Sequence, residues 1–253
     1  MRNNNVSLPV KPRSPADLGG YGKFGIGGTA GSGKTHLTGT GYKDKPILFI
    51  DLEGGSETFN SPNFLNDPNA MPNDMIHVIG FEHLVKPDQT IPPHDLMQLV
   101  LRTLHYVIRT KNSDGYQAVV IDSLTELQNK FIANHPAKDP RQAYGELKDS
   151  FYTMANYIRQ VPTHVFCLSG LKHTFDDEQQ KELIRMNIAP ATWGVISHAF
   201  SAIGYMHAVK RGVKVQRVCD FSLSSVYHTK DRYTIGEVKD PNLIALMESA
   251  KGA

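Results

Sequence analysis

The sequence predicts an α/β fold in which a mostly parallel central sheet is flanked by helices, with an antiparallel hairpin near the C-terminus. Apolar runs typical of buried parallel strands alternate along the chain with amphipathic helical stretches. A glycine-rich loop follows the first strand, and two later strands end in acidic residues. The 253 residues, 40 % of them hydrophobic, suit one large domain over residues 21–253.

The glycine-rich loop GTAGSGKT fits the phosphate-binding pattern G-x-x-x-x-G-K-[ST] at every constrained position. Its glycines let successive N–H groups face a polyphosphate, and the next helix adds its positive end. We expect Lys34 to reach the β- and γ-phosphates and the Thr35 hydroxyl to ligate Mg²⁺. A chance glycine-rich turn is the alternative. The predicted nucleotide-binding residues are Gly28, Thr29, Ala30, Gly31, Ser32, Gly33, Lys34, Thr35 and His36.

The first acidic strand end follows the apolar run at residues 47–50, where the chain continues Asp51-Leu-Glu53-Gly-Gly. Open α/β sheets bind their ligands at the carboxyl ends of the strands. Glu53 is therefore the candidate carboxylate that orients and polarises an attacking water. A surface-loop glutamate is the alternative.

The second acidic strand end is Asp122, which closes the β-branched run at residues 118–121. We expect Asp122 to hold the hydration shell of Mg²⁺, although a strand-end aspartate also caps turns. Ser123 begins the capping box Ser-Leu-Thr-Glu126, so the sequence favours a structural role for it as a helix N-cap.

The remaining elements follow from apolar spacing and turn residues. The strand ending at Ser169 places that hydroxyl near the γ-phosphate. Helices are expected at 34–39, 95–110, 195–203 and from about 241. A further amphipathic helix is expected to place five side chains in the core: Tyr144, Leu147, Phe151, Met154 and Ile158. Strands are expected at 21–27, 75–79, 161–169, 204–209 and 213–221, and residues 56–94 are expected to form an irregular excursion.

Residues 170–193 lack periodicity and read as a long loop of mixed charge. Phe175 and Trp193 suit either stacking on bases or, for Trp193, a place in the core. The densest basic cluster fits a solvated hairpin as well as it fits phosphate contacts. Its members are Lys210, Arg211, Lys214 and Arg217.

Composition and charge bear on the expected partners and cellular location of the protein. A net charge of +2 shows no strong basic excess of the kind common in nucleic-acid proteins, and two cysteines in apolar runs indicate buried side chains in a reducing compartment. No secretory leader or membrane span is evident, so we expect a cytoplasmic protein with no membrane partner. The proline- and asparagine-rich residues 1–20 form an N-terminal arm, either disordered or extended over a neighbouring subunit.

Three stretches together, GTAGSGKT, FIDLEGG and VVIDSLTEL, resemble the RecA-like P-loop ATPases, over roughly residues 21–247. The resemblance implies that Glu53 is the catalytic base and that Asp122 and Ser123 form the magnesium-site pair. Asp122 is followed by serine and not by the glutamate that AAA+ motors need there, which argues against AAA+. Ser169 stands where RecA has a glutamine that relays nucleotide state.

The segment Lys230-Asp-Arg232, followed by Gly236, resembles the K-x-R element of DnaB-type helicases and related recombinases. There both cations reach the γ-phosphate of the neighbouring subunit. The resemblance implies that Lys230 and Arg232 are catalytic in trans and that the chain forms a homo-oligomer, a ring or a filament. A surface Lys-Asp-Arg turn is the alternative.

The best-fitting group is the phage-encoded RecA-like NTPases, which includes single-strand annealing proteins and minimal recombinases. The resemblance implies ATP and Mg²⁺ as cofactors, DNA-binding loops near 133–140 and 172–193, and single-stranded DNA and a single-strand DNA-binding protein as partners in phage recombination. Two other functions use the same loop: a small-molecule or nucleotide kinase, and a nucleotide-switched assembly or loader factor.

Overall fold

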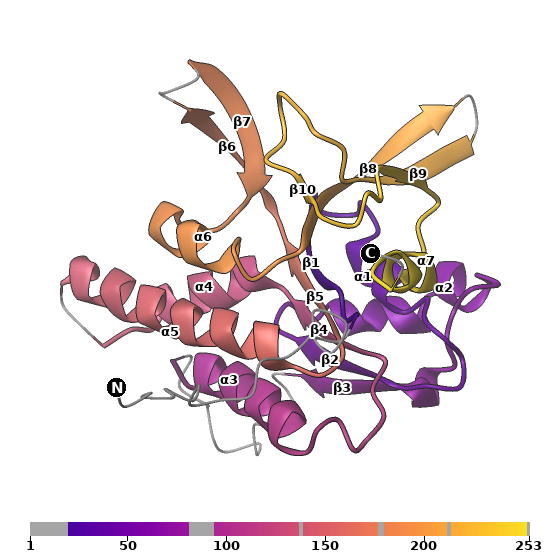
Figure 1. Cartoon of the computed structure of the whole chain (residues 1–253), viewed down its shortest axis with the longest axis horizontal. Coiled ribbons are helices and arrows are strands. Elements are labelled where there is room, and N and C mark those ends of the chain that lie inside the picture. Colours follow the sequence, from indigo (N-terminus) through magenta and orange to yellow (C-terminus); the bar gives the residue numbers. More distant parts are fainter. Residues whose placement is uncertain (1–19, 81–93, 137–138, 177–179, 212–213, 252–253) are drawn as a thin grey trace, which may run out of the picture.

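The computed structural model describes residues 20–80, 94–136, 139–176, 180–211 and 214–251 (Figure 1). The predicted N-terminal arm therefore lies, except for its last residue, outside the described residues. The strands are β1 (Lys23–Gly28), β2 (Ile47–Asp51), β3 (Ile76–Gly80), β4 (Ala118–Asp122), β5 (His164–Ser169), β6 (Leu171–Asp176), β7 (Lys181–Met186), β8 (Ala202–Arg211), β9 (Lys214–Asp220), β10 (Lys230–Asp231) and β11 (Glu237–Lys239). The helices are α1 (Lys34–Thr38), α2 (Pro62–Leu65), α3 (His94–Arg109), α4 (Leu124–Ala133), α5 (Pro140–Gln160), α6 (Pro190–Ile196) and α7 (Leu243–Ser249), with 3₁₀ helices η2 (Gly55–Asn60) and η3 (Asn73–Met75).

Nine of the described strands form one sheet, in the order β11-β9-β8-β1-β5-β4-β2-β3, with β10 paired to β8. The strands from β3 to β8 in this order are parallel, whereas β9, β10 and β11 are antiparallel to their neighbours. The predicted mostly parallel sheet with its antiparallel hairpin is confirmed. β1 lies inside the sheet, between β5 and β8, so the loop that follows it opens at the middle of the sheet edge.

Helices cover both faces of the sheet, because successive side chains of a buried strand point to opposite faces. In β2, Leu48 and Ile50 pack with α3, α4, α5 and α6, whereas Ile47 and Phe49 pack with α1, α2 and α7. Figure 1 shows these two helical layers on either side of the strands. Both predicted buried cysteines lie in these cores.

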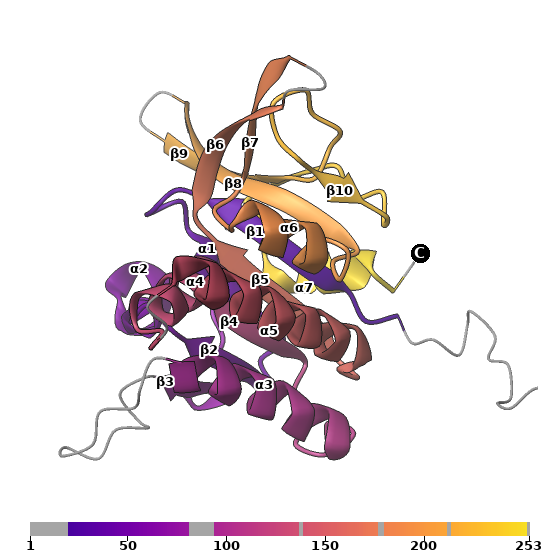
Figure 2. The same cartoon turned by 90° about the vertical axis from the view of Figure 1, so that its left-hand side faces the viewer.

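The segment at 170–193 is not the irregular loop that the sequence predicts. β6 and β7 form an antiparallel hairpin, and α6 follows it. The sequence does not reveal the hairpin because its strands, LKHTFD and KELIRM, neither form an apolar run nor alternate regularly between apolar and polar residues. In Figures 1 and 2 this hairpin and the β8–β9 hairpin project from the same end of the molecule.

Three smaller expectations are corrected. The helix expected at 195–203 is α6, which ends at Ile196, and Ala202 already begins β8. Tyr144 is half exposed and not a core residue, although the other four marked positions of α5 are buried. Part of the 56–94 excursion is ordered around Phe59 and Phe64, which are buried against the α1 face of the sheet; residues 81–93 of it lie outside the described residues.

A buried lysine in β1 makes stability depend on pH. The Lys23 ammonium donates to the carbonyl oxygens of Val161 (2.7 Å) and Thr163 (2.5 Å), and burial lowers the pKa of Lys23 to about 7. The unfolded chain keeps an ordinary lysine, so between pH 7 and about 10 it binds a proton that the folded state has released.

We therefore expect the free energy of unfolding to rise by about 2 kcal/mol between pH 7 and pH 9 from this group alone. Lys23→Met should remove that rise, whereas Lys45→Met, at an exposed lysine, should keep it. Urea denaturation at pH 7, 8 and 9 measures the effect. Equal pH profiles for the wild type and Lys23→Met would contradict it.

Candidate nucleotide site

The phosphate loop connects β1 to α1 and has the backbone that its glycines permit. Gly31 and Gly33 have φ of 73° and 98°, in the left-handed region that favours glycine. The Lys34 ammonium folds back over the loop and donates to the carbonyl oxygens of Gly28 (2.8 Å) and Thr29 (3.0 Å). The strand, loop and helix order that the motif requires is therefore present, and Lys34 lies above the loop.

One polar group in this loop lacks a protein partner. Ser32 is 4 % exposed, and within the described residues its hydroxyl oxygen makes no hydrogen bond. That oxygen lies close to the loop's first residue, since a Cβ added to Gly28 would come within 2.5 Å of it. Buried polar groups are normally hydrogen-bonded, so this hydroxyl fits a site that receives an oxygen-rich ligand.

The two acidic strand ends lie side by side, because β2 and β4 pair with Asp51 opposite Asp122. The Thr35 hydroxyl at the start of α1 donates to Oδ2 of Asp122 at 2.7 Å. The backbone of Gly55 lies close to both groups: a Cβ added there would lie 3.1 Å from the same carboxylate oxygen and 3.4 Å from the Thr35 hydroxyl oxygen. The predicted Mg²⁺ ligands Thr35 and Asp122 are thus in direct contact.

The site brings three carboxylates, those of Asp51, Glu53 and Asp122, near one ammonium group, that of Lys34. Burial raises the pKa of Asp122 to about 6, and the charges of Glu53 and Asp51 act in the same direction, against the Thr35 hydrogen bond and the charge of Lys34. Burial also lowers the pKa of Lys34, although both nearby acids oppose the shift. A divalent cation beside Asp122 would relieve the repulsion among these carboxylates.

Glu53 lies at the same edge of the sheet, in the exposed turn after β2. The Ser123 hydroxyl donates a hydrogen bond to Oε1 of Glu53 and accepts one from the Glu126 N–H at 3.2 Å. The predicted N-cap role of Ser123 is confirmed, because it caps α4. Ser123 also orients the carboxylate that the sequence marks as a candidate base.

The residue that shapes the Glu53 turn is Asp51, to which the sequence analysis assigns no separate role. Burial tends to raise its pKa, but hydrogen bonds from Ser56, Gly54 and Gly55 outweigh burial and lower it. The Asp51 carboxylate accepts from the backbone N–H groups of Glu53 (3.1 Å), Gly54 (2.8 Å), Gly55 (3.0 Å) and Ser56 (2.9 Å). An aspartate followed closely by paired glycines is the signal that points to such a turn.

Ser169 ends β5, next to Gly27 of β1 in the sheet register. Its side chain is fully buried, and its hydroxyl contacts the Thr125 hydroxyl at 2.9 Å and donates to the Gly170 carbonyl at 2.9 Å. The residue is thus close to the strand that carries the loop, but its hydroxyl is engaged within the protein. Its proposed contact with the γ-phosphate stays a prediction.

His36 follows Thr35 in α1 and turns away from the loop. Its Nε2 lies 2.7 Å from the Asp67 carboxylate, and its ring packs edge-on against Phe64 at 5.2 Å between centroids. These contacts fix α1 against α2. Contact between His36 and a nucleotide remains a prediction.

The structure does not bring the predicted trans cations to the chain's own phosphate loop. Lys230 pairs with Ile203 near the beginning of β8, whereas the loop follows the end of the parallel strand β1. The Lys230 ammonium donates to the carbonyl oxygens of Ser197 (3.2 Å) and Phe200 (2.5 Å), just beyond α6. Arg232 is exposed, so of the two it is the cation more accessible to another subunit.

The two candidate stacking residues have different environments. Trp193, a residue of α6, is 4 % exposed and packs in the core, with its ring edge-on to His228. The core alternative is therefore correct for Trp193. Phe175 is 54 % exposed on β6 of the projecting hairpin. Arg217 of the basic cluster is half-buried; the side chains of its other three members lie outside the described residues.

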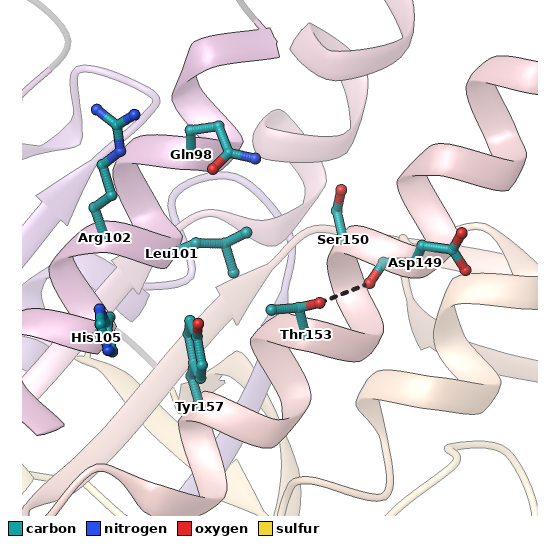
Figure 3. A pocket seen from close by; sticks show the side chains of 8 residues that line it. All are labelled: Gln98, Leu101, Arg102, His105, Asp149, Ser150, Thr153 and Tyr157. Atoms are coloured by element: carbon teal, nitrogen blue, oxygen red, sulfur yellow. Dashed lines mark hydrogen bonds between the residues drawn. The ribbon is translucent and has the colours of Figure 1, made fainter.

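A cavity of about 350 Å³ lies between α3 and α5, away from the phosphate loop. Figure 3 shows Arg102 and His105 on the α3 side and Asp149 and Tyr157 on the α5 side, with the Asp149 carboxylate pointing away from Arg102. It contains none of the predicted site residues. In the described parts of the chain, no three acidic, histidine or cysteine side chains form a metal-binding group, and no helix has the length and apolar character that crossing a membrane needs.

Solved structures similar to this chain share little sequence with it. They are the RadB recombinase (16 % identity, 80 % of each chain covered, TM-score 0.48), the flagellar accessory protein FlaH from Methanocaldococcus jannaschii (11 %, 79 % of this chain and 76 % of that one, 0.47) and a KaiC-like protein from Pyrococcus horikoshii OT3 (12 %, 88 % and 90 %, 0.44). No curated protein sequence matches the chain.

A family model does match. The model AAA_24, described as an AAA domain, matches residues 22–233, which include the phosphate loop and both acidic strand ends. The serine after Asp122 is, on sequence grounds, an argument against an AAA+ motor, and this match to an AAA domain does not support that argument. Because the match spans most of the chain, the protein belongs to the AAA_24 family of AAA domains.

Proposed function

We propose that this protein is a RecA-like P-loop ATPase that hydrolyses ATP at the loop between β1 and α1. The observation that carries the proposal is the convergence of Thr35, Asp122 and Glu53 beside Lys34 at one edge of the sheet. Thr35 donates to Asp122 at 2.7 Å, and Glu53 is oriented by Ser123 on the next strand end. This set provides a cation for the phosphates, ligands for a metal ion and a carboxylate for water.

The metal ion that fits is Mg²⁺, held by the Thr35 hydroxyl and the Asp122 carboxylate. A site with one carboxylate and one hydroxyl suits Mg²⁺, which keeps several waters and is completed by substrate phosphates. When bound, Mg²⁺ neutralises phosphate charge and orients the phosphate chain.

Hydrolysis then needs three tasks from the chain itself. The loop N–H groups and Lys34 hold the phosphates, and Glu53 orients a water and accepts its proton. The water oxygen forms a bond to the γ-phosphorus while the bond from that phosphorus to the bridging oxygen breaks. The electron pair of the broken bond leaves with ADP, and the proton passes from Glu53 to solvent.

We further propose head-to-tail assembly, in which Lys230 and Arg232 of one subunit reach the nucleotide of the next. Their position away from their own loop and the exposure of Arg232 support this arrangement. Trans cations that neutralise charge in phosphoryl transfer are worth about 10³ to 10⁵ in rate. The Lys230 ammonium would have to leave the carbonyl groups that it now contacts, so Arg232 is the stronger candidate.

Mixing two inactive variants tests the trans role. Arg232→Ala and Glu53→Ala subunits should each lack turnover, whereas in a random mixture about one interface in four combines an intact Glu53 with an intact Arg232. The mixture should therefore recover part of the wild-type phosphate release. A mixture no more active than either variant would contradict the trans assignment.

The resemblance of the motifs to phage recombinases leads us to propose single-stranded DNA as the partner, in annealing or strand exchange in the cytoplasm. The hairpins β6–β7 and β8–β9, which project from one end (Figure 2), offer the surface for it. Phe175 is exposed there for stacking. A single-strand DNA-binding protein would be a further partner on the same strand.

Titration of a labelled single strand over a salt series, with and without ATP, tests this partner. We expect tighter binding with ATP and a slope of log K against log salt of about −2 or steeper, because cations released from the phosphates drive binding. No binding, or binding indifferent to both salt and ATP, would contradict the DNA proposal. Phosphate transfer to an acceptor by a monomer would favour a kinase.

A further inference from the structure

We infer that Arg217 of β9 binds the phosphates of the nucleotide held by its own chain. This inference rests on the proposed function and adds a residue in cis to the predicted site. β9 pairs with β8, and β8 pairs with β1, the strand that leads into the loop. A Cβ added to Gly33 would lie 2.6 Å from Nε of Arg217 and 2.7 Å from its Cδ. The guanidinium group therefore lies directly against the phosphate loop.

The sheet fixes this position. Cys219 is fully buried in the core on the α1 face, and Arg217, two residues earlier on the same strand, points to that face. Both backbone polar groups of Arg217 bond to Asp240, whose N–H donates to the Arg217 carbonyl at 2.7 Å and whose Oδ1 accepts from the Arg217 N–H at 3.3 Å. The side chain is thus aimed at the loop by regular structure.

The guanidinium group has no acidic partner in the part of the chain that the structure describes. The ion pairs there involve other cations. The same loop contains the buried Ser32 hydroxyl without a hydrogen-bond partner. Among the described residues, the Arg217 guanidinium thus has no ion pair and the Ser32 hydroxyl has no hydrogen bond, and a phosphate group would supply oxygens for both.

Arginine suits this task because its planar group makes two parallel hydrogen bonds to phosphate oxygens. Gly33 precedes Lys34, in the part of the motif whose N–H groups surround the α- and β-phosphates. Arg217 would therefore contact phosphates that ADP and ATP share, whereas Lys34 also reaches the γ-phosphate. Arg217 and Lys34 would thus contact different parts of the phosphate chain.

Calorimetric titration of the full chain with MgATP and with MgADP tests the inference. Arg217→Ala should weaken both ligands by about tenfold or more, the range expected for hydrogen bonds to charged groups. Arg217→Lys should fall between Arg217→Ala and the wild type. Two controls should stay within twofold of the wild type: Arg102→Ala, an exposed arginine of α3, and Lys239→Ala, on the strand next to β9.

The outcomes separate this inference from the proposed function. Wild-type affinity in Arg217→Ala, with affinity lost in Lys34→Ala, overturns the role of Arg217 and leaves the site intact. Failure of the wild-type protein to bind either nucleotide overturns both. If Arg217→Ala also melts at a lower temperature, Arg217→Lys decides: reduced affinity at the wild-type Tm supports the phosphate contact, and wild-type affinity overturns it.

Discussion

Lys34→Ala should reduce ATP turnover by a factor of about 10³ or more, since a preorganised charge in a phosphate site contributes at this level. The Lys34 ammonium lies over the loop, 2.8 Å from the Gly28 carbonyl oxygen, where the phosphates would replace its present partners. Burial makes this charge costly in the free protein, as its lowered pKa shows. Release of inorganic phosphate from MgATP measures the effect.

The matched control is Lys45→Ala, which removes an exposed lysine after α1 and should keep wild-type turnover. Neither variant should unfold at a lower temperature than the wild type, because Lys45 is exposed and Lys34→Ala removes a partly buried charge together with its two hydrogen bonds to carbonyl groups. Wild-type phosphate release by Lys34→Ala would show that the nucleotide site lies elsewhere.

Glu53→Gln should separate binding from chemistry. The amide keeps the shape of the side chain and still accepts the Ser123 hydroxyl, but it cannot take a proton from water. We expect kcat to fall by a factor of about 10² to 10⁴, the usual contribution of a general base. ATP affinity should be unchanged or higher, because one negative charge near the phosphates is gone. Single-turnover hydrolysis and calorimetric titration measure the two quantities.

Glu57→Gln is the control for this variant. Glu57 is exposed in the 3₁₀ helix that follows the same turn, so Glu57→Gln removes the same charge at a side chain that is not the acceptor of the Ser123 hydroxyl. Turnover near wild type for Glu53→Gln, or an equal loss for Glu57→Gln, would remove Glu53 from the catalytic role and leave the phosphate loop assignment standing.

The parts of the site that depend on local pattern could be predicted from the sequence. The loop motif places Lys34 and Thr35, and apolar runs that end in acids place Glu53 and Asp122 at the carboxyl edge of a parallel sheet. These predictions do not depend on knowing which strands are neighbours. The structure places the two strand ends side by side, with Asp51 paired to Asp122.

Contacts between residues that are far apart in the sequence could not be predicted in this way. Arg217 reaches Gly33 only because β8 and β9 extend the sheet beyond β1, and a cluster of cations in sequence does not reveal which one turns inward. Lys230 likewise meets carbonyl groups beyond α6 that are 30 and 33 residues away. The hairpin β6–β7 could not be predicted because its strands show no regular alternation of apolar and polar residues.

The central claim is that a triphosphate and a magnesium ion bind between the loop at 28–35 and the two acidic strand ends. A crystal structure with Mg²⁺ and a non-hydrolysable ATP analogue tests it most directly. The account predicts phosphates along the loop under Lys34, the metal ion in contact with Thr35 and Asp122, and Glu53 facing the γ-phosphate. A nucleotide bound elsewhere, or a phosphate chain from which Asp122 and Glu53 both turn away, would contradict the account.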